Sequence, residues 1–405
     1  VSQMKRTNLE NWIETTEALP ELSREGLEGL QLRRLNETLV RLKEREGFYR
    51  DYPSKLDSLS DLHKLPFTTA ADLSAHPGQF LLTSQSEVSR VISGATSGTT
   101  GPAKRVFYTA KDTEHTVGFF AAGISEMLSE GEKCCIVFPF SGPFGLGDLI
   151  ARAVERLGAV PIKAGFGQTW GELIAIVKET RPETYIGFPV TLLGLIRMHE
   201  GAFPIRRALV SGDACPEGVM AALEEALGSR LYPHYGCREC GLGGAVTCSA
   251  FEGMHIRENH ILPEIIDENG NVLPEGEYGE LVLPTIGAEA MPLIRYRTGD
   301  FTRILPPCPC GGITRRLDKV SRREGKLSME TLDSALFSVP ELVDYRAAFN
   351  GKLHIDARCR EGKGEEALLN AVRMRYPQLE TEITVTPAHP DHRPMYLGKR
   401  SVVYL

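Results

Sequence analysis

The sequence predicts an α/β protein with a large N-terminal domain and a small C-terminal domain. From residue 133 onward, short apolar runs alternate with helix-like segments at a spacing of roughly 25 residues, which indicates βαβ units and a mostly parallel sheet. After residue 250 the pattern becomes β-rich, and the last 80 or so residues read as a compact α+β unit. We therefore expect parallel sheets flanked by helices, a β-rich subdomain, and a small, mobile α+β domain.

The expected elements follow in chain order. Leucines at helical spacing predict an amphipathic helix over 22–45. The strands of the parallel sheet are expected at 133–139, 159–164, 184–188, 206–212 and 230–236, and the helices between them at 147–158, 170–182 and 216–228. Hairpins with Asn-Gly and Glu-Gly turns are expected over 260–285. The final unit should contain helices at 329–337 and 364–376 and strands at 344–349, 352–358 and 382–387.

A short polar stretch at 322–325 reads as a hinge between the two domains. The sequence therefore predicts a large domain over 1–321 and a small domain over 322–405.

Composition excludes some classes of partner. The 405 residues carry a formal net charge of -7, which argues against a nucleic-acid or membrane-surface role. No apolar run reaches the roughly 18 residues that cross a bilayer, and the stretch "VSQMKRTNLENW" lacks the order of a signal peptide. Nine cysteines suit metal or thiol chemistry in a reducing compartment better than a disulfide framework. We expect a cytoplasmic protein.

The stretch "SGATSGTTGPAKR" at 93–105 has two interpretations. It can be a solvated surface loop, because Gly, Ser and Thr are common turn residues. It can also be a phosphate cradle, in which small residues bring backbone N–H groups to an anion and a cation completes the charge match. Its place between an expected strand at 86–92 and a helix-like segment at 111–128 favours the cradle.

A second constellation consists of cysteine and histidine. Cys248, His255, Cys308 and Cys310 have the spacing C-x₆-H…C-P-C, and three thiolates with one imidazole form a closed, structural zinc site. A rival set, which we rank second, uses Cys237 and Cys240 with Cys308 and Cys310; its first two cysteines flank Arg238 and Glu239 in the stretch "HYGCREC". The third reading is that all are buried thiols. The remaining four cysteines are expected in the core: Cys134, Cys135, Cys215 and Cys359.

Four motifs occur in an order and at spacings that carry a family resemblance: "TSGTTGPAK", "HYGCREC", "RYRTGD" and "LGKR". From roughly residue 30 to the end, the chain resembles the adenylate-forming acyl-CoA synthetases. Its segments "FYRDYP…LSDLHKLPFTTAADL", "HILPEIIDENG" and "PLIRYRTGD" are similar to the phenylacetate-CoA ligase branch. The resemblance implies that a carboxylate attacks the α-phosphate of ATP to give acyl-AMP and pyrophosphate, and that the thiol of coenzyme A then displaces AMP. It also favours a homodimer.

The resemblance also implies site residues. Lys399 would bridge the carboxylate and the α-phosphate, Glu239 would hold Mg²⁺, Arg322 would be the hinge arginine and Glu324 the pivot. Asp300 would accept hydrogen bonds from the ribose, and Tyr235 would lie against adenine. Further nucleotide contacts are expected from the phosphate loop, from the segment beside adenine and from the tyrosine motif: Thr96, Ser97, Gly98, Thr99, Thr100, Gly101 and Lys104; Gly212, Asp213 and Ala214; and Gly236.

Two departures from the family pattern bear on function. Arg238 stands where the family has a hydroxyl residue, and "SRREGKLSMETLDSAL" has Ser-Met-Glu where a glycine of the thioester-forming loop is expected. Two alternatives to a CoA ligase therefore stay open: an adenylate-forming enzyme with a non-CoA acceptor, and a nucleotide-binding scaffold without the second half-reaction. The acid itself can be aromatic or aliphatic, since the candidate pocket segments 138–148 and 187–192 are apolar.

Overall fold

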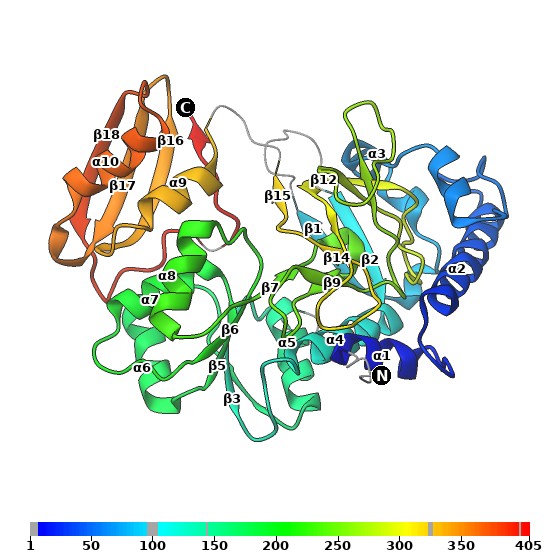
Figure 1. Ribbon diagram of the computed structural model, residues 1–405, viewed down its shortest axis with the longest axis horizontal. Coiled ribbons are helices and arrows are strands. Elements are labelled where there is room, and N and C mark those ends of the chain that lie inside the picture. The colour runs from blue at the N-terminus through cyan, green and yellow to red at the C-terminus, as the bar shows by residue number, and fades with distance from the viewer. Residues whose placement is uncertain (1–6, 95–103, 143–144, 323–326, 397) are drawn as a thin grey trace. The chain divides into compact units, whose positions relative to one another are not determined.

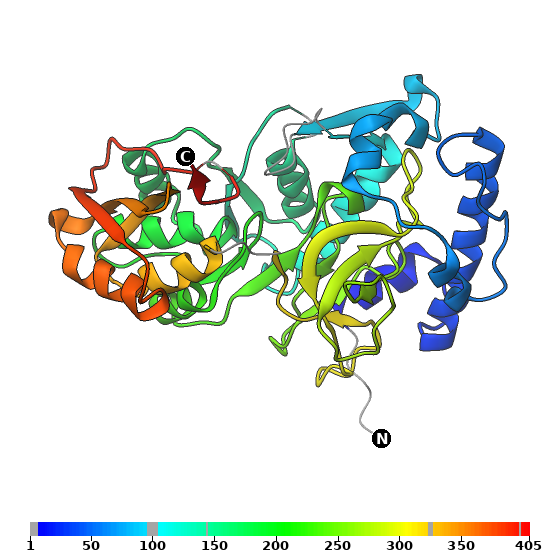
Figure 2. The same cartoon turned by 90° about the horizontal axis from the view of Figure 1, so that it is seen from above.

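The computed structural model describes residues 7–94, 104–142, 145–322, 327–396 and 398–405. The chain forms two compact units, which are described separately (Figures 1 and 2). The first unit contains the chain up to Glu126 and residues 234–323, and the second contains residues 127–233 and 324–405. None of the helices that the structure describes combines the length and the apolar character that a membrane crossing needs.

A parallel sheet forms the centre of the second unit. Its strands lie in the order β7-β6-β5-β3-β4 and all pair in parallel: β3 (Lys133–Val137), β4 (Val160–Lys163), β5 (Thr184–Gly187), β6 (Arg207–Val210) and β7 (Tyr232–Tyr235). Crossover helices connect them, as parallel pairing requires: α5 (Leu146–Arg156), α6 (Trp170–Thr180), α7 (Pro189–Met198) and α8 (Glu217–Leu227). Strands β3 and β5 are buried almost throughout, which explains their continuous apolar sequences.

The C-terminal residues add a second sheet to this unit, in the order β18-β17-β16-β19. Its strands are β16 (Leu342–Phe349), β17 (Leu353–Cys359), β18 (Thr381–Pro387) and β19 (Val403–Tyr404), with helices α9 (Met329–Leu336) and α10 (Glu365–Arg375). Arg197 of α7 donates to the carbonyl of Phe337 at 2.6 Å, and a Cβ on Gly218 of α8 would lie 2.1 Å from the carbonyl oxygen of Ser334 in α9. Close packing therefore joins these residues to α7 and α8 in one core.

The first unit combines helices with antiparallel sheets. Helix α1 (Asn8–Thr16), helix α2 (Arg24–Arg45), the short α3 (Ala70–Ala75) and α4 (Ala110–Ile124) accompany the hairpin of β1 (Val88–Gly94) and β2 (Lys104–Thr109). One antiparallel sheet has the order β10-β11-β12-β15: β10 (Glu264–Ile266), β11 (Gly279–Leu283), β12 (Tyr296–Thr302) and β15 (Ser321–Arg322). Strand β7, which ends in this unit, pairs antiparallel with β8 (Ala245–Val246). Antiparallel pairing then continues from β8 to β9 (Met254–Ile256), β14 (Arg316–Leu317) and β13 (Ile304–Leu305) in turn.

The predicted α/β class and the βαβ series are confirmed. Helix α2 buries the predicted leucine stripe, and α9, α10, β16, β17 and β18 begin and end within two residues of their predicted bounds, whereas β19 was not predicted. Helix α7 was not predicted. The strand and the helix expected on either side of the Gly-rich stretch are confirmed as β1 and α4, but β2 was not predicted. It begins at Lys104, inside that stretch, and pairs with β1 before α4 starts. The division at 321/322 and the hinge at 322–325 stay predictions.

Candidate active site and candidate metal centre

Lys104 and Glu239 form the centre of the candidate active site. Lys104 is the first residue of β2, and Glu239 lies in the short 3₁₀ helix η4 (Arg238–Cys240) directly after β7. The Lys104 Nζ donates to Glu239 Oε1 at 2.5 Å, and also to the hydroxyl oxygen of Tyr296 at 2.9 Å. The Tyr296 hydroxyl in turn donates to Glu239 Oε1 at 3.2 Å. Three separate elements thus bring a cation, a carboxylate and a phenol together.

The carboxylate of Glu239 is buried yet stays ionised. Burial raises its pKa, but the charge of Lys104 and the hydrogen bond from Lys104 lower it by more, and the net pKa lies below the ordinary value of 4.5. The pKa of Tyr296 is raised, by burial and then by the charge of Glu239, so this phenol keeps its proton and remains a donor. An ionised, largely buried carboxylate is a suitable oxygen ligand for Mg²⁺.

Tyr235 and Asp300 form a second pair in the first unit. The Tyr235 hydroxyl, on the last residue of β7, donates to Asp300 Oδ2 on β12 at 2.8 Å. Burial raises the pKa of Tyr235 well above 10, which keeps its hydroxyl protonated. The next residue has to be glycine, because a Cβ on Gly236 would lie 2.0 Å from the carbonyl oxygen of Leu242. The Tyr235 hydroxyl therefore orients the carboxylate of Asp300, the residue that the family resemblance assigns to the ribose.

The other predicted residues divide between the two units. Arg322, on β15, pairs in register with Asp300 of β12 in the first unit. In the second unit, Gly212 has a φ of +86° and a hypothetical Cβ there would meet the rings of Phe188 and Phe138. Asp213 and Ala214 are half-buried beside it, and Lys399 is exposed. The members of the predicted phosphate loop and the predicted pivot lie outside the described residues: Thr96, Ser97, Gly98, Thr99, Thr100, Gly101 and Glu324.

Two tyrosines in the site were missed by the sequence analysis. Tyr296 belongs to the "RYRTGD" motif, so its position beside Asp300 was a signal that could have been followed. Tyr108 on β2 donates its hydroxyl proton to the backbone carbonyl of Arg238, and thereby fixes η4 against the hairpin. Nothing in the sequence spacing indicates this second contact, because the two residues are 130 positions apart.

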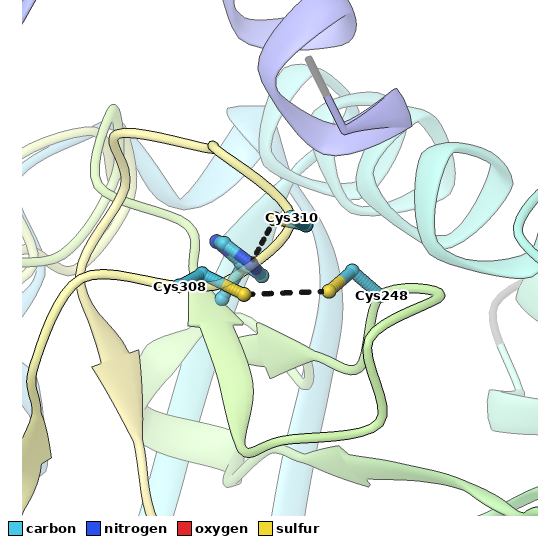
Figure 3. Close-up of side chains that lie close together, drawn as sticks. Cys248, Cys308 and Cys310 are labelled. Atoms are coloured by element: carbon cyan, nitrogen blue, oxygen red, sulfur yellow. Dashed lines mark hydrogen bonds between the residues drawn. The ribbon is translucent and has the colours of Figure 1, made fainter. Parts of the chain in front are cut away.

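The four residues of the preferred zinc set do come together, and Figure 3 labels the three cysteines among them. The ligand atoms of Cys248, His255, Cys308 and Cys310 all lie within 4.8 Å of one another. The sulfur atoms of Cys248 and Cys308 are 3.7 Å apart, and Cys310 Sγ lies 3.4 Å from His255 Nε2. Zinc–sulfur bonds of about 2.3 Å in a tetrahedron require sulfur atoms about 3.8 Å apart. The donor set and its dimensions therefore fit a four-coordinate zinc ion.

Side chains behind His255 set the orientation of its ring. Its Nδ1 lies 2.8 Å from the Thr314 hydroxyl oxygen, and Thr314 donates to Glu10 Oε1 from both its hydroxyl and its backbone N–H, at 3.0 and 2.8 Å. Glu10 is 1% exposed and belongs to α1. Because the Thr314 hydroxyl donates its hydrogen bond to the carboxylate, its oxygen is free to accept one from Nδ1–H of His255, which leaves Nε2 as the nitrogen that faces the cluster.

The rival zinc set is not assembled in this structure. Cys240 Sγ accepts from the backbone N–H of Cys237 at 3.3 Å and donates to the Cys237 carbonyl at 3.4 Å, so it closes its own turn. Neither Cys237 nor Cys240 belongs to the cysteine–histidine cluster. Of the cysteines predicted for the core, Cys134, Cys135 and Cys359 are buried and Cys215 is half-buried.

Comparisons with known proteins identify the family to which the chain belongs. Residues 95–288 match the family model of AMP-binding enzymes. Phenylacetate-coenzyme A ligase of Aromatoleum evansii is 34% identical over 327 residues, which cover 76% of this chain and 72% of that protein. The enzyme of the same name from Thermus thermophilus is 31% identical over 359 residues, covering 81% of this chain and 79% of that one. The solved structure of 2-hydroxyisobutyryl-CoA ligase in the postadenylation state shares the fold, with a TM-score of 0.79, 20% identity, and coverage of 95% and 90%.

The fold and the nucleotide motifs together define an adenylate-forming enzyme. Within that class, the chain belongs to the phenylacetate-coenzyme A ligase family. It is an AMP-forming carboxylic acid–CoA ligase.

Proposed function

We propose that this ligase activates a small aromatic acid of the phenylacetate class, using the site residues that surround the Lys104–Glu239 pair. The names of its relatives support this substrate class. So does an aromatic cluster in the second unit, where the ring centroids of Phe138 and Phe166 lie 5.0 and 5.6 Å from that of Phe188. The rings of Phe138 and Phe188 adjoin Gly212, a member of the segment expected beside adenine. A flat apolar acid suits such a surface better than a polar one.

The first half-reaction places negative charge on phosphate oxygens, which the proposed residues are suited to receive. Lys104 would lie at the edge of the β- and γ-phosphates and Glu239 would hold Mg²⁺. The bound ion would supply charge neutralisation between the phosphates. Asp300, oriented by Tyr235 at 2.8 Å, would accept hydrogen bonds from the ribose hydroxyls. The observation that carries this proposal is the ion pair itself, a buried ionised acid and a lysine placed together by β2 and η4.

Lys399 would supply the charge that neither Lys104 nor the metal provides, where the carboxylate meets the α-phosphate. A cation at that position stabilises the oxygens on which charge develops during attack. Arg322, the expected hinge arginine, would act when the small domain turns between the two half-reactions. In the second half-reaction the thiol of coenzyme A attacks the acyl carbon and AMP leaves, so the acyl–oxygen bond breaks as the thioester forms.

We also propose that the cysteine–histidine cluster binds one structural Zn²⁺. The support is the 3.7 Å sulfur–sulfur separation, the burial of three of the four ligands and the oriented imidazole. With four protein ligands there is no open position, so the ion would stabilise the loops around residues 248 and 308–310 and take no part in the chemistry. A cytoplasmic location and a homodimer stay predictions.

The roles are tested by separating the two half-reactions. Lys399→Ala should lower acyl-adenylate formation on the order of a hundredfold. Formation of the thioester from supplied acyl-AMP and CoA should change far less, because that step has no α-phosphate attack to stabilise. An equal loss in both half-reactions would contradict the role given to Lys399.

A further inference from the structure

The loop that carries Lys399 is held at both ends by carboxylates of the second unit. We call residues 395–400 the lysine loop; residue 397 lies outside the described part. At its start, the Met395 backbone N–H donates to Asp344 Oδ2 at 2.5 Å, and the Met395 carbonyl accepts from the Arg346 guanidinium at 2.9 Å. At its end, the Arg400 backbone N–H donates to Asp213 Oδ2 at 2.8 Å.

The Arg400 side chain secures the end of the loop more deeply. Arg400 is 6% exposed, and its guanidinium lies 3.0 Å from Asp344 Oδ1 and 3.1 Å from Asp333 Oδ1 and also donates to the Tyr345 carbonyl. The rings of Tyr345 and Tyr396 lie 4.6 and 4.8 Å from it. A buried guanidinium with two carboxylates and aromatic faces has one well-defined position. Asp344 thus binds both ends of the lysine loop at once.

The chain beyond the loop is fixed as well. Val402 is buried, and β19 pairs in parallel with Ala348 and Phe349 of β16. The Leu405 N–H donates to the Phe349 carbonyl at 2.9 Å. Lys399 therefore has an exposed side chain on a backbone that is anchored on either side. This backbone is held in place, although terminal residues of a domain are often poorly ordered.

We infer that Asp213 and Arg400 are positioning residues for Lys399 in adenylate formation. Asp213 belongs to the segment expected beside adenine, so its hydrogen bond to the Arg400 N–H ties the lysine loop to that segment. Arg400 holds the same backbone from the other side through Asp333 and Asp344. Fixing the lysine backbone in advance lowers the entropic cost of placing its ammonium group on the substrate. This inference rests on the proposed role of Lys399 and assigns Asp213 a function other than contact with the base.

Asp213 is the better residue to test, because it is half-buried, whereas replacing Arg400 leaves two buried carboxylates without their cation and can unfold the sheet. Asp213→Ala should lower acyl-adenylate formation about tenfold and leave thioester formation from supplied acyl-AMP unchanged. Asp213→Asn, whose amide oxygen can still accept the Arg400 N–H, should recover most of the loss. Asp356→Ala, which removes an exposed acid from the same unit, is the matched control and should change neither rate.

A double-mutant cycle separates positioning from a direct contact with ATP. In a Lys399→Ala background, Asp213→Ala should have almost no further effect on adenylate formation, since the group that it positions is gone. A contact with the base would cost the same factor in both backgrounds, and that additive result would overturn the inference. Hydrogen exchange gives a second readout. The backbone amides of the lysine loop should exchange faster in Asp213→Ala but not in Asp356→Ala, and unchanged exchange would overturn the inference.

The proposed function and the inference fail in different ways. If Lys399→Ala leaves adenylate formation intact, the role of Lys399 is wrong, and the catalytic part of the inference is overturned with it. If Lys399→Ala abolishes adenylate formation while Asp213→Ala has no effect on rate or exchange, only the positioning by Asp213 is wrong.

Discussion

The ammonium group of Lys104 and the carboxylate of Glu239 are joined at 2.5 Å, although the two residues are 135 positions apart in the sequence. The hairpin brings one and the turn after β7 brings the other, and Tyr296 of β12 bonds to both. The two groups that the family assigns to phosphate and to metal are thus held together within a single unit. This ion pair keeps the Glu239 carboxylate ionised, as the proposed binding of magnesium requires.

Lys104→Met should change the pH dependence as well as the rate. Burial alone raises the pKa of Glu239, and in the native protein Lys104 reverses that effect. Without the lysine the carboxylate becomes protonated at higher pH. The acid limb of the pH–rate profile for Mg²⁺-dependent pyrophosphate exchange should therefore shift to higher pH. The rate at neutral pH should fall on the order of tenfold. Arg105→Met removes the neighbouring exposed cation and should leave the limb in place; identical limbs in both variants would exclude the proposed coupling.

Glu239→Ala and Asp300→Ala should respond differently to magnesium. Loss of the proposed metal ligand lowers affinity for Mg²⁺, so activity should be partly restored when the ion is raised about tenfold or more. Loss of the proposed ribose acceptor should raise the KM for ATP by about tenfold at every magnesium concentration. Steady-state rates across a grid of ATP and Mg²⁺ concentrations measure both effects. Rescue of both variants, or of neither, would contradict the assigned roles.

The protein should contain about one zinc ion per chain. Cys310→Ser should lose the metal and destabilise the loops that it joins by several kcal/mol. Cys240→Ser, in which the changed sulfur lies outside the cluster, should retain the metal. Glu10→Gln should still bind zinc, but with an affinity reduced at least tenfold. The loss of the carboxylate weakens the hydrogen bonds through which Thr314 orients the His255 ring. Metal analysis and chelator competition give these values. Zinc retained in Cys310→Ser but lost in Cys240→Ser would transfer the site to the rival set.

Asp333→Asn should flatten part of the pH dependence of stability. Burial raises the pKa of Asp333 from 3.8 to about 6, although Arg400 opposes the shift. The folded state therefore binds this proton more tightly than the unfolded chain does. The resulting stabilisation is fully present below about pH 3.8 and is lost as the pH rises through about 6, a change of about 3 kcal/mol.

Asparagine cannot titrate, so the variant does not lose this stabilisation as the pH rises. The unfolding free energy of the variant minus that of the native protein should therefore increase from about pH 4.5 to about pH 7.5. Urea unfolding at the two pH values measures the difference. A difference in unfolding free energy that is the same at both values would show that Asp333 does not titrate in this way.

Much of the fold follows from local patterns. The run Cys134–Val137 is apolar because β3 is buried on both faces, and such runs spaced by amphipathic segments indicate a parallel sheet. Helix α7 was missed because its first residue is Pro189 after Gly187 and Phe188, a sequence that reads as a loop, although proline is favoured at a first helical position. Strand β2 was missed because its partner β1 lies across the Gly-rich stretch.

The candidate site was predictable only in its residue types. The sequence ranked the set with Cys248 and His255 above the rival set with Cys237 and Cys240, but its assembly depends on where β9 and the loop at 308–310 meet. Likewise, motifs named Glu239 and Lys104 separately, whereas their ion pair and the bond from Tyr296 are tertiary contacts. The anchoring contacts of the lysine loop follow from no motif spacing, because Asp333 lies in α9, Asp344 in β16 and Asp213 in the loop after β6. Only the fold brings them to the two ends of that loop.

The most direct test of the whole account is carboxylate-dependent exchange of labelled pyrophosphate into ATP, followed by addition of coenzyme A. With phenylacetate and related aromatic acids, the purified protein should exchange pyrophosphate only when acid and Mg²⁺ are both present. On adding CoA it should release AMP and form one thioester per AMP. ATP binding without acid-dependent exchange would contradict the account, and exchange without any thioester would refute the second half-reaction.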